Sequence, residues 1–305
     1  MTWELTGVPY TSMKEPGGIA GAIVALRECG LADELRSLGV EDAGDLLLEE
    51  PSGERGPSGV LNEPALVRLV EATHDRVVDA HRAGRRPLLV GGDCPVLLGA
   101  LAAVQRDCPA PGLLMLDGHE DAWPPTLSPT GEASDSEIAI ALGRVPDLPA
   151  PVSHLLPLLE PSTVAFLGPR DREELATAGL ESLRDQVAFY ADDIETSAAL
   201  RAGHDPAEAA LEAMAADGFW LHIDLDALRT EALGAVDYRQ PGGLAWDELD
   251  RLAATAANAA GCRGASVVIY NPELDANRID ARKIVAFLSR LIAASAEANL
   301  GGGGR

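Results

Sequence analysis

Short apolar segments alternate along this chain with longer segments of helical periodicity. Runs rich in Val, Ile and Leu predict strands, since parallel strands are buried on both faces. They lie at residues 87–90, 113–116, 163–167, 187–190, 219–223 and 265–269. Apolar residues at spacings of three and four predict helices at 18–28, 63–83, 95–106, 206–216, 246–260 and 279–298. This alternation is typical of βαβ units and predicts an α/β fold with a mostly parallel central sheet.

The polar segments between these elements are interpreted as loops rather than as linkers. Residues 49–62 and 123–136 are rich in Pro, Gly, Ser and Thr, and the chain ends in the glycine-rich segment 301–305. A chain of 305 residues with 47% apolar residues can bury one substantial core. We therefore predict a single domain over residues 1–300 and a flexible tail over 301–305.

The net charge and the cysteines indicate which kinds of partner and which cellular compartment to expect. The chain has 24 basic and 48 acidic residues, a net charge of −24, which repels phosphate backbones and anionic lipid headgroups. We therefore expect neither nucleic acid nor a membrane surface as a partner. No apolar run approaches membrane-spanning length and the N-terminus lacks a signal-peptide pattern, so we expect a cytoplasmic protein. The 4 cysteines are few and far apart, which favours reduced thiols.

Two strings of alternating ionisable residues follow predicted strands. The first contains Asp117, His119 and Asp121, and the second contains His222, Asp224 and Asp226. In an extended segment such alternating side chains point to one face. Proteins with parallel sheets bind their substrates and cofactors at the carboxyl ends of the strands. Four packed aspartates repel one another unless cations compensate them, so we predict divalent metal ions, with Mn²⁺ best suited to oxygen ligands and imidazole. The alternative for either string alone is a solvated loop.

Three motifs occur in order along the chain: Gly-Gly-Asp-Cys-Pro at 91–95, Asp-Gly-His-Glu-Asp at 117–121 and His-Ile-Asp-Leu-Asp at 222–226. They are similar to the motifs Gly-Gly-Asp-His-Ser, Asp-Ala-His-x-Asp and Ser-x-Asp-x-Asp of the arginase/agmatinase/formiminoglutamase (ureohydrolase) family. Shorter matches lie at 25–27, 44–46, 168–171, 241–244 and 271–272. The resemblance spans nearly the whole chain and implies an arginase-like three-layer α/β/α sandwich.

The resemblance also implies a pair of divalent metal ions, Mn²⁺ first among them. The implied ligands are Asp117 and Asp224 for both ions, Cys94 and Asp121 for the first ion, and His119 and Asp226 for the second. The family uses such a pair to bind a hydroxide that attacks the planar carbon of a guanidine or formimino group. The implied activity is hydrolysis of a non-peptide C–N bond in a small linear amidine, guanidino or ureido compound. Family members commonly form trimers or hexamers, so the resemblance allows a homo-oligomer.

Cys94 stands where the family has its first histidine ligand. A thiolate is a soft, charged ligand, which weakens the Lewis acidity of a bound ion and favours softer metals. The alternative is that Cys94 is a small buried thiol beside a site for one ion.

The family's proton-shuttle histidine is replaced by Ser134. Glu132 and Asp135 are the nearest ionisable residues and are candidate catalytic acids. Their alternative role is to cap the helix predicted to begin at Ser136. His222 takes the small-hydroxyl position of the third motif, and we consider both a catalytic supporting role and a hydrogen bond within the sheet.

Ile269 occupies the position of the family glutamate that pairs with a guanidinium. An apolar side chain cannot neutralise that cation, so ordinary arginase or agmatinase activity is not expected. The lost shuttle histidine and the lost glutamate leave an alternative function, a catalytically silent family member with a binding or scaffold role.

Overall fold

The eight strands in the described part of the chain join one sheet in which every neighbouring pair is parallel. The computed structural model describes the backbone of residues 2–301 and the side chains of residues 2–295. The strand order is β2-β1-β3-β8-β7-β4-β5-β6. The strands are β1 (Thr2–Gly7), β2 (Glu41–Asp45), β3 (Arg85–Val90), β4 (Pro111–Leu116), β5 (Val164–Gly168), β6 (Phe189–Asp192), β7 (Gly218–Asp224) and β8 (Cys262–Val268). The predicted parallel α/β sheet is confirmed.

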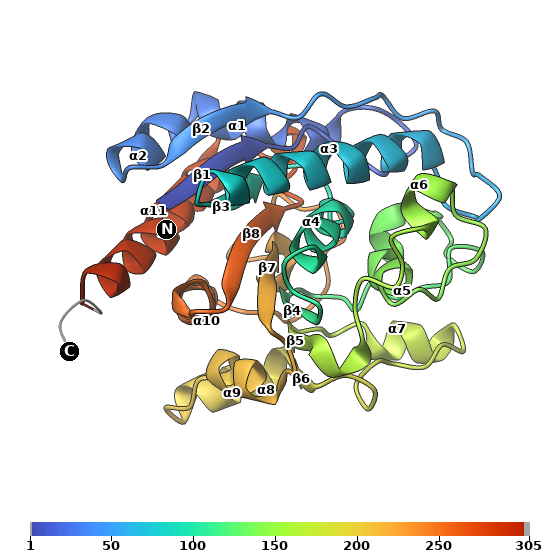
Figure 1. Ribbon diagram of the computed structural model, residues 1–305. Coiled ribbons are helices and arrows are strands. Elements are labelled where there is room, and N and C mark those ends of the chain that lie inside the picture. The colour runs from blue at the N-terminus through green and yellow to red at the C-terminus, as the bar shows by residue number, and fades with distance from the viewer. Residues whose placement is uncertain (1, 302–305) are drawn as a thin grey trace.

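Helices flank both faces of the sheet and complete the predicted three-layer sandwich. Figure 1 shows α3 and α4 on one face and α10 and α11 on the other. The α-helices are α1 (Ala22–Glu28), α2 (Leu31–Ser37), α3 (Glu63–Arg82), α4 (Val96–Gln105), α5 (Glu137–Ala141), α6 (Ala150–Ser153), α7 (Arg172–Thr177), α8 (Asp193–Arg201), α9 (Pro206–Ala213), α10 (Trp246–Asn258) and α11 (Ile279–Gly301). The 3₁₀ helices are η1 (Gly18–Gly21), η2 (Ala133–Asp135), η3 (Pro161–Thr163), η4 (Leu225–Ala227) and η5 (Pro272–Leu274).

Two strands, β1 and β2, were not predicted from the sequence because their residues do not form apolar runs. β2 lies at the edge of the sheet, where a strand needs little burial, and its sequence EDAGD is largely polar. β1 is buried but contains Glu4, whose carboxylate pairs with Arg85 on the neighbouring strand at 2.7 Å. Ion pairing thus makes a charged residue acceptable in a buried strand, which apolar patterning alone does not detect.

The helix α4 is apolar on all sides and lies in the core between α3 and the sheet. Its residues from Val96 to Val104 are buried, and it contacts β4, β7 and β8 as well as α3. Gly99 permits the close approach of α3, because a Cβ atom there would lie 2.5 Å from the carbonyl oxygen of Val70. This packing holds the start of α4, and Cys94 just before it, against the middle of the sheet.

Among the described residues, no helix is both long and apolar enough to cross a membrane. Helix α11 continues through Gly301, the first residue of the predicted tail. The rest of that tail, residues 302–305, lies outside the described residues.

Candidate metal centre and pocket

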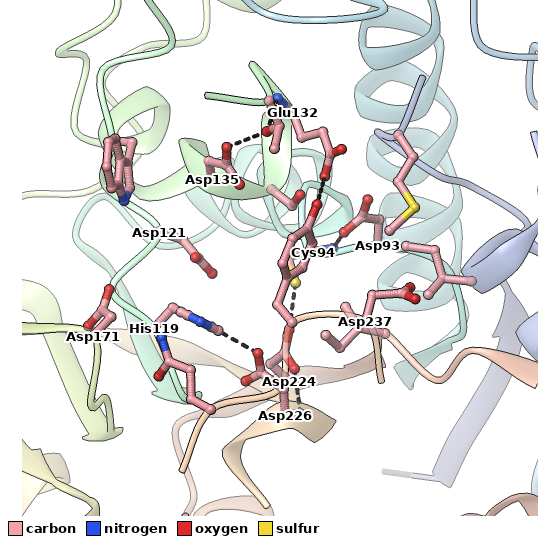
Figure 2. A pocket seen from close by; sticks show the side chains of 18 of the residues that line it. Asp93, Cys94, His119, Asp121, Glu132, Asp135, Asp171, Asp224, Asp226 and Asp237 are labelled. Atoms are coloured by element: carbon pink, nitrogen blue, oxygen red, sulfur yellow. Dashed lines mark hydrogen bonds and ion pairs between the residues drawn. The ribbon is translucent and has the colours of Figure 1, made fainter. Parts of the chain in front are cut away.

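The three motifs predicted to bind metal meet because the strands that precede them are neighbours or near neighbours in the sheet. The strand order β3-β8-β7-β4 brings together four carboxyl ends. Cys94 follows β3, Asp117 directly follows β4, and Asp224 is the last residue of β7. Carboxyl ends of parallel strands share one edge of the sheet, so residues distant in sequence converge there. Figure 2 shows Cys94, His119, Asp224 and Asp226 in this cluster.

The predicted ligands form two groups of three side chains, and the ligand atoms of each group lie within 4.8 Å of one another. One group is Cys94, Asp117 and Asp224, and the other is Asp117, His119 and Asp226. Cys94 Sγ donates a hydrogen bond to Asp224 Oδ2 at 2.8 Å, and His119 Nδ1 lies 2.8 Å from Asp226 Oδ2. Asp117 belongs to both groups, and its Oδ2 atom is buried without a hydrogen-bond partner. A shared cation is the kind of partner that such an orphaned oxygen requires.

The two strings do not stay extended, as the alternation argument assumed. Asp224 Oδ1 accepts from the backbone N–H of Asp226 at 2.7 Å, and η4 begins at once. Asp117 Oδ1 accepts from the N–H of His119 at the same distance. These local bonds turn the chain after each strand. The two motifs are also joined directly, since the N–H of Gly118 donates to Asp226 Oδ1 at 3.0 Å.

Asp121, the sixth predicted ligand, lines the same pocket but belongs to neither three-residue group. Its backbone has a φ of 46°, which is uncommon for a residue other than glycine. Burial raises the pKa of its carboxyl well above the ordinary value, and the charges of Glu137 and Asp224 raise it further. Its carboxyl therefore lies beside the cluster, and its role as a sixth ligand stays a prediction.

The electrostatics of the cluster favour a cation. Burial, followed by the charges of neighbouring acids, raises the pKa of Asp117 and of Asp224 well above the ordinary value. Burial and then the charge of Asp224 do the same for the pKa of the Cys94 thiol. Burial disfavours the His119 imidazolium, yet Asp226 raises its pKa to about 9. Protons thus compensate the charges of these groups, and a divalent cation would replace the protons. The residues fit the metal ions that the resemblance implies.

A pocket of about 240 Å³ opens above the cluster and contains both candidate catalytic acids. Glu132 Oε2 accepts from the Tyr238 hydroxyl at 2.8 Å, and burial, then Asp93, raises the pKa of Glu132 to about 7. Asp135 accepts from Thr130 Oγ1 at 2.6 Å. Neither η2 nor α5 has a side-chain cap. The capping alternative for the two acids is therefore wrong.

His222 does not line this pocket, although it was a candidate catalytic residue. Its side chain is fully buried, and Nδ1 lies 2.7 Å from Ser266 Oγ on the adjacent strand β8. Burial lowers its pKa to about 3, so the imidazole is neutral. The structure therefore supports the hydrogen bond within the sheet and removes His222 from contact with a substrate.

Sequence reasoning missed several side chains that complete the site. Asp237, Tyr238 and Arg239 line the pocket from the segment between η4 and α10. No motif marks these three residues. Ser134, at the shuttle position, lies 3.0 Å from Ser12 Oγ, and the Ser12 hydroxyl in turn donates to Asp93.

Glu137 is a further residue that the sequence did not reveal. It is fully buried at the start of α5, and its ligand atoms lie within 4.8 Å of those of Cys94 and His222. A glutamate in the first turn of a helix ordinarily signals only a favourable interaction with the helix dipole, so nothing in the pattern distinguished it.

Ile269 lies in the pocket, as its alignment predicted. It directly follows β8 and has a φ of 62°, a strained conformation for a β-branched residue. Its N–H donates to Gly92 O at 2.9 Å, which ties it to the loop that carries Cys94. The apolar side chain thus occupies a constrained position in the wall of the pocket.

Comparison with known proteins places this site in a family. The sequence profile of the arginase family matches residues 4–294. The chain is 28% identical over 291 residues to an arginase from Brevibacillus brevis, covering 94% of this chain and 96% of that relative. The structure of the arginase from Bacillus caldovelox matches with a TM-score of 0.80 at 24% identity, covering 95% of this chain and 98% of that one. Formimidoylglutamase from Bacillus subtilis matches with a TM-score of 0.73 at 17% identity, covering 96% and 87%. The chain therefore belongs to the arginase family.

Proposed function

We propose that the protein is a metal-dependent hydrolase that cleaves a non-peptide C–N bond of a linear amidine, guanidino or ureido compound. The observation that carries this proposal is the pair of ligand groups that share the buried Asp117 and whose other members line a pocket. Membership of the arginase family supports the reaction class. The relatives compared above are named arginase and formimidoylglutamase, and both names describe hydrolysis at an amidine-type carbon.

In this proposal the cluster holds two divalent ions, with Mn²⁺ as the first choice because carboxylates dominate the ligand set. The proposed ligands are Asp117 and Asp224 for both ions, Cys94 and Asp121 for the first, and His119 and Asp226 for the second. When bound, the ions supply Lewis acidity that makes water a nucleophile near neutral pH.

Glu132 is the proposed proton donor to the departing nitrogen. Its pKa of about 7 keeps a substantial fraction protonated near neutral pH, which suits a general acid. The hydroxyl of Tyr238 fixes the orientation of the carboxyl group through a 2.8 Å hydrogen bond. Asp135 is bound to Ser128 and Thr130, so its proposed role is to hold the loop that carries Glu132.

The pocket is strongly acidic, and its lining residues include one guanidinium, that of Arg239. Asp93, Glu132 and Asp237 line the same pocket. A substrate with a small polar, weakly basic head at the ions and a charged tail near Arg239 fits this distribution. Ile269 gives the wall beside the ions an apolar surface, which disfavours a full guanidinium there.

A second candidate function is that of a silent family member that binds a small ligand. It is supported by Ser134, which leaves no titratable side chain at the shuttle position and instead lies 3.0 Å from the Ser12 hydroxyl.

A screen of guanidino, ureido and formimino compounds for release of ammonia or urea separates the two functions. The full chain is loaded with Mn²⁺, Co²⁺, Ni²⁺ or Zn²⁺, and Asp117→Asn serves as the inactive control. Turnover that requires metal and is lost in Asp117→Asn supports the hydrolase. Absence of turnover across the screen, together with binding of a compound in the pocket, favours the silent alternative.

A further inference from the structure

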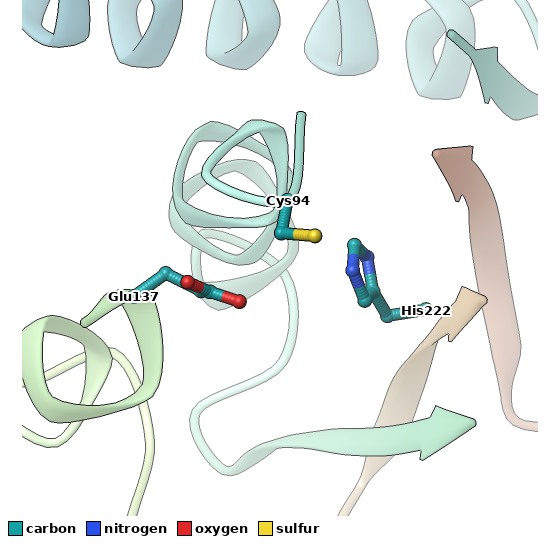
Figure 3. Close-up of side chains that lie close together, drawn as sticks. All are labelled: Cys94, Glu137 and His222. Atoms are coloured by element: carbon teal, nitrogen blue, oxygen red, sulfur yellow. The ribbon is translucent and has the colours of Figure 1, made fainter. Parts of the chain in front are cut away.

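A third group of ligand atoms lies behind the pocket and shares only Cys94 with the two groups that the proposed hydrolase uses. It consists of Cys94, Glu137 and His222, whose Sγ, carboxylate and imidazole atoms lie within 4.8 Å of one another. Figure 3 shows the three side chains converging from the start of α4, from α5 and from β7. Cys94 lines the pocket but Glu137 and His222 do not, so these two side chains do not face a substrate there.

Glu137 and His222 each contribute buried polar atoms that no hydrogen-bond donor or acceptor satisfies. Both carboxylate oxygens of Glu137 are buried without a hydrogen-bond donor, and their neighbour there is the carboxyl of Asp121. Nε2 of His222 is also buried without a partner. Glu137 and His222 both have 0% exposure. A buried polar atom without a partner is destabilising, and both Glu137 and His222 carry such atoms close to Cys94. One cation at this point would satisfy atoms on both side chains.

The hydrogen bonding of His222 leaves Nε2 as the nitrogen available to a cation. Its Nδ1 atom lies 2.7 Å from Ser266 Oγ, which also accepts from Trp220 Nε1 at 2.9 Å. Coordination through Nε2 requires the proton on Nδ1, where Ser266 accepts it. Buried metal-binding histidines are commonly held by such a second hydrogen bond, which fixes both the tautomer and the ring.

The number of anionic side chains in and around the cluster also favours a third cation. The four aspartates of the proposed pair, Asp117, Asp121, Asp224 and Asp226, compensate two divalent ions. A Cys94 thiolate and a Glu137 carboxylate add two further negative charges that this pair leaves uncompensated. The six anionic groups together balance about three divalent ions, and a thiolate has enough lone pairs to contact two metals.

We propose that Cys94, Glu137 and His222 form a third cation site, for a borderline-soft divalent ion such as Zn²⁺. Thiolate, imidazole and carboxylate are the three ligand types of protein zinc sites. Metal–ligand bonds of about 2.0–2.3 Å place tetrahedral donors roughly 3–4 Å apart, so the group needs only a small contraction. The site shares Cys94 with the proposed pair and holds α4, α5 and β7 together.

Zinc content of the full chain tests this site without recourse to activity. The parent, loaded with Zn²⁺ and passed through gel filtration, is expected to retain about three equivalents. Glu137→Gln and His222→Gln are each expected to retain about one equivalent less. Glu63→Gln is the matched control, because Glu63 is also a buried glutamate at a helix start but is bound to Ser58, and it should keep the parent content.

Cobalt gives a second readout, since a Co²⁺–thiolate bond produces a charge-transfer band. In Asp226→Asn, which weakens the proposed pair, the band due to the third site should persist, whereas Glu137→Gln should reduce it. If Asp226→Asn keeps the metal content of the parent while Glu137→Gln has a lower content, the result contradicts the proposed pair but supports the third site. Equal metal content and equal bands in the parent, Glu137→Gln and His222→Gln would overturn the third site.

Crystals of the parent soaked in Zn²⁺ decide the matter even if a variant does not fold. Anomalous density within bonding distance of both Cys94 Sγ and His222 Nε2 is the expected result. Anomalous peaks confined to the aspartate cluster would overturn the proposal.

Discussion

Cys94 Sγ donates a 2.8 Å hydrogen bond to Asp224 Oδ2, which joins the first and third motifs across 130 positions of sequence. The residue that replaces the family histidine therefore contacts a carboxylate of the metal cluster directly. A thiol that merely filled space in the core would not need this partner. The contact supports Cys94 as a ligand that exchanges its proton for a cation, and it motivates the first prediction.

Cys94→Ala is expected to lower the Mn²⁺ content from about two equivalents to about one, since the first ion loses a ligand while Asp117, His119 and Asp226 still hold the second. Cys94→His should restore the content, because imidazole is the family's ligand at this position. Metal analysis after gel filtration measures both. Cys108→Ala is the control, as Cys108 is also a buried free cysteine. Unchanged Mn²⁺ content in Cys94→Ala would mean that Cys94 is only a buried thiol.

Asp117→Asn is expected to reduce Mn²⁺ binding at both positions, since Asp117 belongs to both ligand groups. The remaining acids then lack the carboxylate that bridges the ions. Isothermal titration with Mn²⁺ measures the loss. Asp171→Asn is the control, because Asp171 is buried at the same pocket but belongs to neither group. Near-normal binding in Asp117→Asn would refute the two-ion arrangement.

Glu132→Gln is expected to change how stability depends on pH. Burial raises the pKa of Glu132 from an ordinary 4.5 to about 7 in the folded chain. Its contribution to stability is therefore fully present below pH 4.5 and is lost as the pH rises through 7. Glu132→Gln should lose less stability than the parent over this window. Thermal unfolding of the metal-free proteins across the window measures the difference, and parallel curves would contradict the assigned pKa.

Arginine and agmatine are expected to be poor substrates, by about 100-fold or more in kcat/KM relative to a ureido or weakly basic amidine substrate. The reason is Ile269, whose apolar side chain cannot pair with a guanidinium. Ile269→Glu should narrow the gap. Release of urea from arginine and agmatine, and of ammonia from the comparison substrate, measures it in parent and variant. Efficient release from arginine by the parent would show that another pocket acid takes over the pairing.

The sequence by itself determined the parallel α/β fold, because the apolar runs of buried strands are local patterns. It also located Asp117, His119, Asp224 and Asp226, which follow two of those strands directly. Since parallel strands end at one edge of the sheet, their convergence was predictable from the strands alone. Family resemblance added Cys94 and Asp121 to the cluster.

Only the tertiary structure decided which of the remaining polar groups face that cluster. Glu137 is an ordinary first-turn glutamate in sequence, and His222 is one alternating residue of a strand, yet α5 and β7 bring both against Cys94. Tyr238 reaches Glu132 across 106 positions. Such contacts arise from the crossing of helices and loops over the sheet. Their energies depend on burial and on partners distant in sequence, so a local sequence pattern cannot predict these contacts.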